Sequence, residues 1–159
     1  MRTLLLSGLL AISVLAATTA DCADLGASVY AQRCAACHGV DGQGTPGVAP
    51  ALKGEPGRLA AAPGGREYLI QAVMFGLMGP IRSGGQQYQG AMPAIGQQLT
   101  PEDAAALLNY VVTGLNAGNQ PTWQPISPAE VTQVSAARLS PTALARKRAT
   151  LGADSRAAE

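Results

Sequence analysis

The segment Cys34-Ala35-Ala36-Cys37-His38 sets the tightest limits on the structure of this chain. Two thiols three residues apart can add across the two vinyl groups of one haem, and the histidine after the second thiol is placed to ligate the iron. The pattern is typical of a covalent haem c attachment site. A chain with this pattern folds around a haem, which is large, flat and mostly apolar. We therefore expect the cofactor to form part of the core.

Three other interpretations of these cysteines are less favoured. A disulfide between Cys34 and Cys37 would close a short loop, gain little chain entropy and leave His38 without a role. A zinc site would need Cys22 as well, at a spacing unlike that of zinc fingers. A thioredoxin-like site requires a βαβ unit, and the 19 glycines and 11 prolines exclude a regular βαβ sheet or a long helical bundle.

Residues 1–20 are expected to be a cleaved secretory signal peptide. Arg2 supplies the positive start, residues 4–17 are apolar, and small residues lead to a cleavage site after Ala20. This apolar stretch is shorter than the ~20 residues that span a bilayer, which disfavours an uncleaved membrane anchor. Lipidation of Cys22 is disfavoured because Asp21 precedes it, where a lipoprotein signal has Gly, Ala or Ser. We therefore expect export to the periplasm and no stable membrane span after cleavage.

Composition and charge exclude several partners. Eleven Lys and Arg against ten Asp and Glu give a nearly neutral molecule, which disfavours binding to nucleic acid. Six aromatic residues are few for a core of this size, which agrees with a core that contains a cofactor. We expect one domain over residues 21–119 and a Pro-containing C-terminal extension over residues 120–159.

The sixth ligand of the iron has to come from outside the attachment motif. His38 is the single histidine, so a haem with two histidine ligands is excluded. The remaining candidates are Met74, Met78, Met92, Lys53, Cys22, a water molecule or no ligand at all.

Met92 is the candidate that the local sequence favours. It lies in a segment, residues 88–94, that is expected to be a loop, in which Gly90 permits close approach of the backbone and Pro93 constrains the chain after the sulfur. Met74 and Met78 lie in Arg66–Met78, whose apolar spacing predicts a helix. A core or haem-wall role is therefore expected for those two methionines.

Residues 24–118 resemble the small mono-haem class I cytochromes c. The resemblance is carried by residues 29–39, which run into the attachment motif, by Pro50 twelve residues after His38, by Met92-Pro93-Ala94, and by residues 99–111. It implies an all-α fold in which short helices wrap around one haem c attached through Cys34 and Cys37. It also implies that the Pro50 carbonyl accepts a hydrogen bond from Nδ1 of His38 and that His38 and Met92 ligate the iron.

The last helix of the domain is also readable from the residues themselves. Thr100 before Pro101 is an N-cap, Asp103 can close a capping box, and an apolar stripe from residue 107 to 112 ends at Gly114. The resemblance implies that this helix crosses the first one, where Gly26 or Ala27 and Tyr30 would meet Leu107 and Tyr110.

The C-terminal extension departs from the family pattern. Ser127-Pro128 and Ser140-Pro141 each predict the start of a short helix. The extension carries five Lys and Arg against three Asp and Glu, whereas residues 21–119 carry five against seven. These opposite net charges could hold the extension on its own domain or on a partner, with Trp123 as an anchor, and a loosely ordered extension is the alternative.

The expected function is electron transfer without catalytic residues. Residues 66–90 resemble the cytochromes that accept electrons from periplasmic dehydrogenases, so a dehydrogenase is the expected donor and a cytochrome or oxidase the expected acceptor. One alternative is a tightly bound haem subunit of a dehydrogenase or oxidase complex. A second alternative is a haem enzyme or gas sensor, which would require an open sixth site on the iron.

Overall fold

The computed structural model describes residues 19–116 and 123–152, with the backbone alone for residues 19–23. The expected signal peptide, apart from its last two residues, and the side chain of Cys22 lie outside the described part. The elements in chain order are α1 (Thr19–Arg33), α2 (Ala35–His38), α3 (Glu55–Ala61), α4 (Gly65–Phe75), β1 (Leu77–Ser83), β2 (Gln86–Met92), the 3-10 helix η1 (Ile95–Gln98), α5 (Pro101–Asn109), the π-helical turn η2 (Tyr110–Gly114), α6 (Pro128–Ala136) and α7 (Pro141–Thr150).

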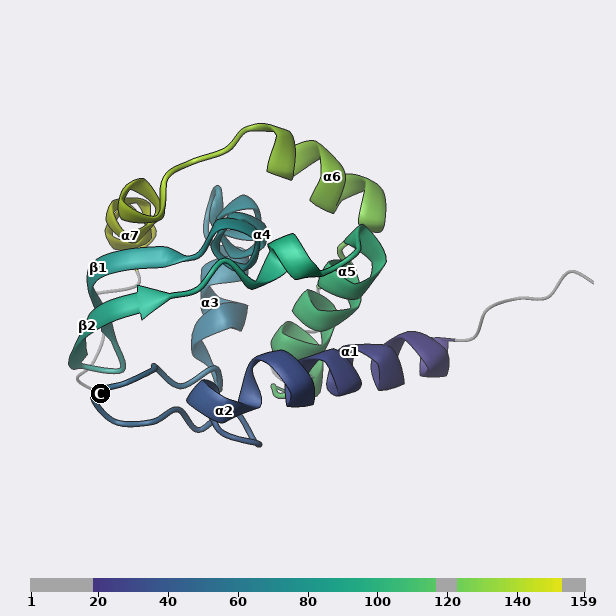
Figure 1. Cartoon of the computed structure of the whole chain (residues 1–159), viewed down its shortest axis with the longest axis horizontal. Helices are drawn as coiled ribbons and strands as arrows, with labels where there is room; N and C mark the ends of the chain where they lie inside the picture. Colours follow the sequence, from purple (N-terminus) through teal and green to yellow (C-terminus); the bar gives the residue numbers. More distant parts are fainter. Residues whose placement is uncertain (1–18, 117–122, 153–159) are drawn as a thin grey trace, which may run out of the picture.

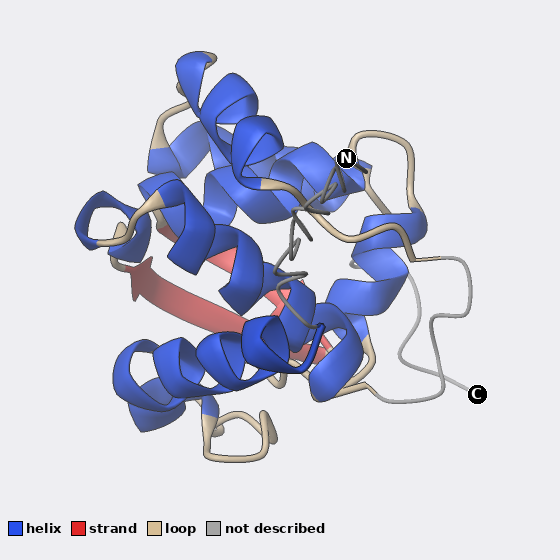
Figure 2. Ribbon diagram, turned by 90° about the vertical axis from the view of Figure 1, so that its right-hand side faces the viewer, coloured by secondary structure: helices blue, strands red, loops and turns tan. Residues whose placement is uncertain are grey.

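Helices make up most of the fold, as predicted, and one antiparallel hairpin accompanies them (Figures 1 and 2). In Figure 1 helices α1 and α2 lie along one side, α6 and α7 along the opposite side, and α3, α4 and the hairpin lie between them. None of the described helices combines the length and the apolar character needed to cross a bilayer.

Helices α1 and α5 cross at a small residue. A side chain at Gly26 would overlap the Ala106 carbonyl oxygen and crowd Cβ of Tyr110, so the two backbones touch at this point. The rings of Tyr30 and Tyr110 lie beside the crossing with their centroids 5.6 Å apart. The predicted crossing is thereby confirmed, with Gly26 as the contact residue.

Helix α5 begins with the predicted capping box. The Asp103 backbone N–H donates to Oγ1 of Thr100 at 3.1 Å, and the Thr100 backbone N–H donates to the Asp103 carboxylate at 3.4 Å. These bonds occupy backbone donors that the helix leaves without partners. The helix continues into the π-helical turn η2, which ends at Gly114 as predicted.

The prediction of a helix over Arg66–Met78 was wrong at its C-terminal end. Helix α4 ends at Phe75, because Gly76 takes φ = 75° and leads the chain into β1. Met78 therefore lies on a strand and is 54% exposed, so it belongs neither to the core nor to a haem wall. Gly76 also lies directly against the carbonyl of Met92, where any side chain would overlap the oxygen.

The expected loop around Met92 is also a strand. Leu77 pairs with Met92, Gly79 with Gly90 and Ile81 with Tyr88, so Met92 is the last residue of β2. The turn is formed by Gly84 and Gly85, both with positive φ. Two glycines between alternating segments are a hairpin signal, and the sequence analysis did not use it.

The described part of the C-terminal extension packs against the domain. Helices α6 and α7 begin as predicted, with the hydroxyls of Ser127 and Ser140 accepting N–H bonds and a proline in each first turn. The extension places Ile126, Val131 and Leu144 in the main core, each at most 3% exposed. A loosely ordered extension is therefore wrong for residues 123–152.

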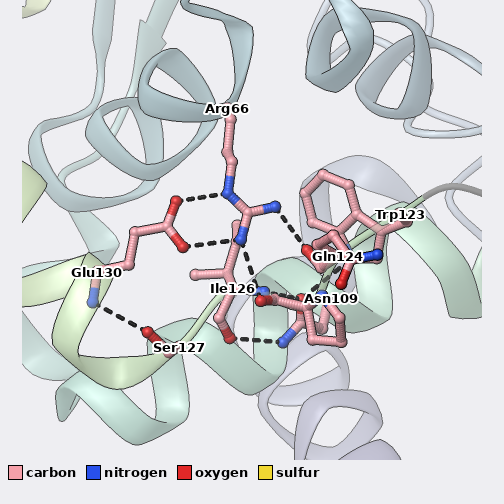
Figure 3. Close-up of polar contacts among 8 residues, drawn as sticks. Arg66, Asn109, Trp123, Gln124, Ile126, Ser127 and Glu130 are labelled. Carbon is pink, nitrogen blue, oxygen red and sulfur yellow. Dashed lines mark hydrogen bonds and ion pairs between the residues drawn. The ribbon is translucent and has the colours of Figure 1, made fainter.

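Polar contacts hold the start of the extension (Figure 3). Asn109 accepts bonds from the Trp123 indole at 3.2 Å and from the Ile126 N–H at 2.8 Å. Arg66 lies over the Trp123 ring at 4.6 Å and donates to the carboxylate of Glu130. Trp123 thus anchors the extension as expected, and the Glu130 side chain binds Arg66.

Candidate haem-binding site

The attachment motif lies at the end of α1. The Cys34 N–H donates to the Tyr30 carbonyl at 2.8 Å, and the His38 N–H donates to the Cys34 carbonyl at 2.9 Å, so the motif continues as the helical turn α2. This turn brings Cys34, Cys37 and His38 to the wall of one cavity. Cys34 is buried and Cys37 is exposed at this wall.

His38 is oriented by Pro50, as the family resemblance implied. Nδ1 of His38 lies 2.8 Å from the Pro50 carbonyl oxygen. A carbonyl accepts, so Nδ1 carries the proton and Nε2 keeps its lone pair for a metal. Burial lowers the pKa of His38, and the bond to Pro50 opposes that shift in part. The ring is therefore neutral at neutral pH, which is the form that coordinates iron.

The loop between His38 and Pro50 is held by two bonds that the sequence analysis missed. The Tyr30 hydroxyl donates to the Gly39 carbonyl at 2.6 Å. Oγ1 of Thr45 donates to the Cys37 carbonyl at 2.7 Å. Both join residues at least eight positions apart, and no local sequence signal reveals such pairs.

The space beside His38 is an apolar slot with two adjoining cavities. Both cavities are lined by Cys34, His38, Pro50, Leu77, Ile81 and Met92. The outer cavity continues along one face of the hairpin, and the inner one continues to the core side chains of α4 and α5. Alternate residues of the paired part of the hairpin line the outer cavity, namely Leu77, Gly79 and Ile81 of β1 and Tyr88, Gly90 and Met92 of β2.

A flat apolar ligand fits this slot. Gly79 and Gly90 face each other across the hairpin and line the outer cavity, and a Cβ at either position would meet no atom within 4 Å. The glycine pair leaves a strip without side chains. The slot has two thiols and an imidazole at one side, the Met92 thioether in the lining of both cavities, and apolar walls. A covalently attached haem requires groups of these kinds.

The structure describes three of the other candidates for the sixth ligand, and none of these three lines the slot. Met74 packs against Gly96 and the main core, Met78 is exposed on β1, and Lys53 lines a separate polar cavity. Met92 lines both parts of the slot. Among the described side chains, those of residues 24–116 and 123–152, no three from His, Cys, Asp or Glu gather as a metal site.

Comparisons with known proteins agree with this geometry. The cytochrome c family model matches residues 23–114. The chain is 40% identical over 128 residues to cytochrome c-552 of Thermus thermophilus, which covers 80% of this chain and 96% of that protein. A second cytochrome c-552, from one strain of Thermus thermophilus, is also 40% identical over 128 residues. The matched part covers 80% of this chain and 85% of that protein. This chain therefore belongs to the cytochrome c family and is a mono-haem electron-transfer protein whose haem c is attached through Cys34 and Cys37.

Proposed function

We propose that this chain carries single electrons between periplasmic redox proteins, with His38 and Met92 as the axial ligands of its haem. A haem iron with histidine and methionine ligands is six-coordinate and low-spin in both oxidation states, so little rearranges when an electron moves. The observation that carries the proposal is the slot that His38 and Met92 share. With both ligands in place the iron has no open position for a substrate.

Docking to partners is proposed to occur at the mouth of the slot. Among the described residues that line the outer cavity, Arg33 is the single charged side chain, and Val48 is 66% exposed there. A nearly uncharged surface gives little electrostatic steering and suits a small, transient interface. The proposed donor is a dehydrogenase, and the proposed acceptor is a cytochrome or oxidase.

The alternative of a permanently bound subunit is supported less well. A permanent link to a partner would need a surface such as the extension, whose net charge is opposite to that of the domain. Ile126, Val131 and Leu144 of the extension are instead buried in the core of this same chain. Copurification at low and high salt separates the two forms, because a transient partner is lost in at least one condition and an obligate partner is retained in both.

The proposed maturation removes residues 1–20 and leaves a domain over 21–119 with the extension 120–159. Cleavage after Ala20 would fall within the first turn of α1. Mass spectrometry of the exported protein tests this, because the mass reports both the cleavage site and one added haem. A protein that keeps its leader contradicts the proposal.

Optical spectroscopy of Met92→Ala tests the axial ligand. The wild type is expected to be low-spin, with the weak far-red band of a sulfur-to-iron bond, and the variant is expected to lose that band. Met78→Ala is the matched control, because Met78 is 54% exposed on β1. A wild type that is high-spin or binds carbon monoxide would overturn the proposal in favour of an enzyme or sensor with an open site.

A further inference from the structure

The side chain of Asn116 joins the end of the α5–η2 helix to the loop that carries Pro50. Asn116 is buried, with 5% of its surface exposed. Its Oδ1 accepts the Gly54 backbone N–H, and its Nδ2 donates to the Leu52 carbonyl at 3.1 Å and to the Val111 carbonyl at 2.8 Å. Both donors of the amide and its oxygen therefore have partners, and these partners fix which end of the amide is the oxygen.

The same helix end also touches the first half of the loop. The Gly42 carbonyl accepts the Leu52 N–H at 2.8 Å, so the two halves of the loop are bonded to each other. Gly42 lies beside Leu115, where a Cβ on the glycine would approach Cδ1 of the leucine to 2.9 Å. Leu115 and Asn116 therefore contact the loop both before and after Pro50.

The part of the loop that these contacts hold determines the orientation of His38. The Pro50 carbonyl oxygen lies 2.8 Å from Nδ1 of His38. The Gly44 backbone lies against that of Pro50, where a Cβ on the glycine would approach the carbonyl carbon to 2.8 Å. The Gly44 N–H donates to the His38 carbonyl at 2.7 Å. Because the loop is packed this closely, a displacement of residues 52–54 would move the carbonyl to which His38 is bonded.

We propose that Asn116 is a positioning residue of the haem site, which holds the loop so that the Pro50 carbonyl stays bonded to Nδ1 of His38. This inference rests on the proposed function, in which His38 ligates the iron. A hydrogen bond at Nδ1 increases the donor strength of Nε2. A stronger donor favours the oxidised state of the iron, which carries one more positive charge than the reduced state. Asn116 lines neither cavity of the slot, so it acts through the loop.

Asn116→Asp tests this assignment in the reduced holoprotein. The aspartate has the same shape but, as a carboxylate, lacks both N–H donors and would face the carbonyls of Leu52 and Val111. We expect the Nδ1 proton of His38 to exchange with solvent about tenfold faster, measured by NMR spectroscopy at pH 7, because the lost bonds make local opening of the loop easier.

Asn109→Asp is the matched control from the same helix. The Asn109 amide accepts the Ile126 N–H at 2.8 Å and donates to the Ile126 carbonyl at 2.9 Å, so the same substitution there releases the extension instead of the loop. We expect the exchange of the His38 proton to change less than about twofold in this control. Equal exchange rates in the two variants, whether raised or unchanged, overturn the proposal.

Asn116→Leu separates the effect of the loop from that of a new charge. Leucine is neutral and makes no side-chain hydrogen bond. We expect the redox equilibrium of this variant to move about threefold toward the reduced form, since a looser bond at Nδ1 weakens the histidine as a donor. A midpoint potential that is unchanged or lower than that of the wild type overturns the proposal.

The wild type decides if neither Asn116 variant yields holoprotein. The Nδ2 protons of Asn116 and the Nδ1 proton of His38 are expected to be protected from exchange to a similar degree, because one opening of the loop would expose both. Asn116 protons that exchange as fast as those of an exposed amide overturn the proposal. The far-red band separates this inference from the proposed function: a wild type without the band refutes ligation by Met92, whereas variants that keep both the band and the wild-type exchange rate refute the role of Asn116 alone.

Discussion

Gly79 and Gly90 stand opposite each other in the hairpin and line the cavity beside His38. Their value to the site is the absence of a side chain, because a Cβ at either position would extend into open space. His38 shows the complementary case, in which one carbonyl, that of Pro50, selects the tautomer of the ring. Single residues therefore shape the site in two ways. The Pro50 carbonyl orients the His38 ring, and the pair Gly79 and Gly90 leaves part of the slot free of side chains.

Gly90→Leu should obstruct the slot. The new side chain would point toward the space that the haem occupies, and overpacking of this kind costs ~1–3 kcal/mol. We expect less haem per protein and a weaker far-red band, measured from the ratio of haem to protein absorbance. Gln89→Leu is the control, since it adds the same side chain on the other face of β2. Full haem content in Gly90→Leu would contradict this use of the glycine pair.

Elements are joined at a few close contacts. Helices α1 and α5 touch at Gly26, and the sheet follows α4 through Gly76, which lies against the Met92 carbonyl. Helix α6 is tied to α4 by the ion pair between Glu130 and Arg66. Each of these contacts holds a helix or strand in place. That element either contributes a residue to the haem slot or packs against an element that contributes one.

Gly26→Ala should destabilise the protein despite the better helix propensity of alanine. The propensity gain is ~1 kcal/mol, whereas the added methyl overlaps a backbone carbonyl oxygen, which no change of rotamer relieves. We expect a net loss of ~1–3 kcal/mol in the free energy of unfolding of the holoprotein in urea. Ser28→Ala, at an exposed position of α1, is the control. If the variant has the same free energy of unfolding as the wild type, α1 and α5 can move apart to accommodate the methyl group without loss of stability.

The joint between α4 and α6 should weaken in acid. Hydrogen bonding to Arg66 lowers the pKa of Glu130, against a smaller opposing effect of burial. A carboxylate with a lowered pKa in the folded state adds stability above its unfolded pKa, and this stability is lost as the pH falls through the folded pKa. We expect Glu130→Gln to cost on the order of 1 kcal/mol at pH 7, since the pair is partly exposed. In urea unfolding the difference from the wild type should shrink as the pH falls below the ordinary pKa of a glutamate; a difference independent of pH would exclude the ion pair as its cause.

The whole molecule closes around the haem slot from two directions. The domain supplies the attachment turn, the hairpin and the α1–α5 crossing, and the extension covers α4 and β1 from the other side (Figure 1). Cations of the extension meet anions of the domain in the pairs of Arg148 with Glu55 and Lys147 with Glu67. The pair of Arg66 and Glu130 has the reverse polarity, so the net charges of the two parts do not by themselves explain the docking.

Removal of the haem should unfold much of the molecule. The apolar walls of the slot would then face each other across empty space, and a ligand that binds the folded state alone contributes its binding energy to stability. We expect the haem-free chain, or the Cys37→Ser variant, to lose the cooperative thermal transition of the holoprotein in circular dichroism. A native-like spectrum and transition without haem would show that the polypeptide core suffices.

Short-range signals in the sequence determined the haem attachment turn, the Thr100 capping box and the starts of α6 and α7, because each depends on residues within about four positions. The axial role of Met92 remains a prediction of the sequence. The tertiary structure showed that residues 77–92 form a hairpin, whose two-glycine turn signal the sequence analysis did not use. It alone decided that Arg148 reaches Glu55, 93 positions away. Pairing between strands and contacts between distant helices depend on the packing of the whole chain, which the pattern of neighbouring residues does not specify.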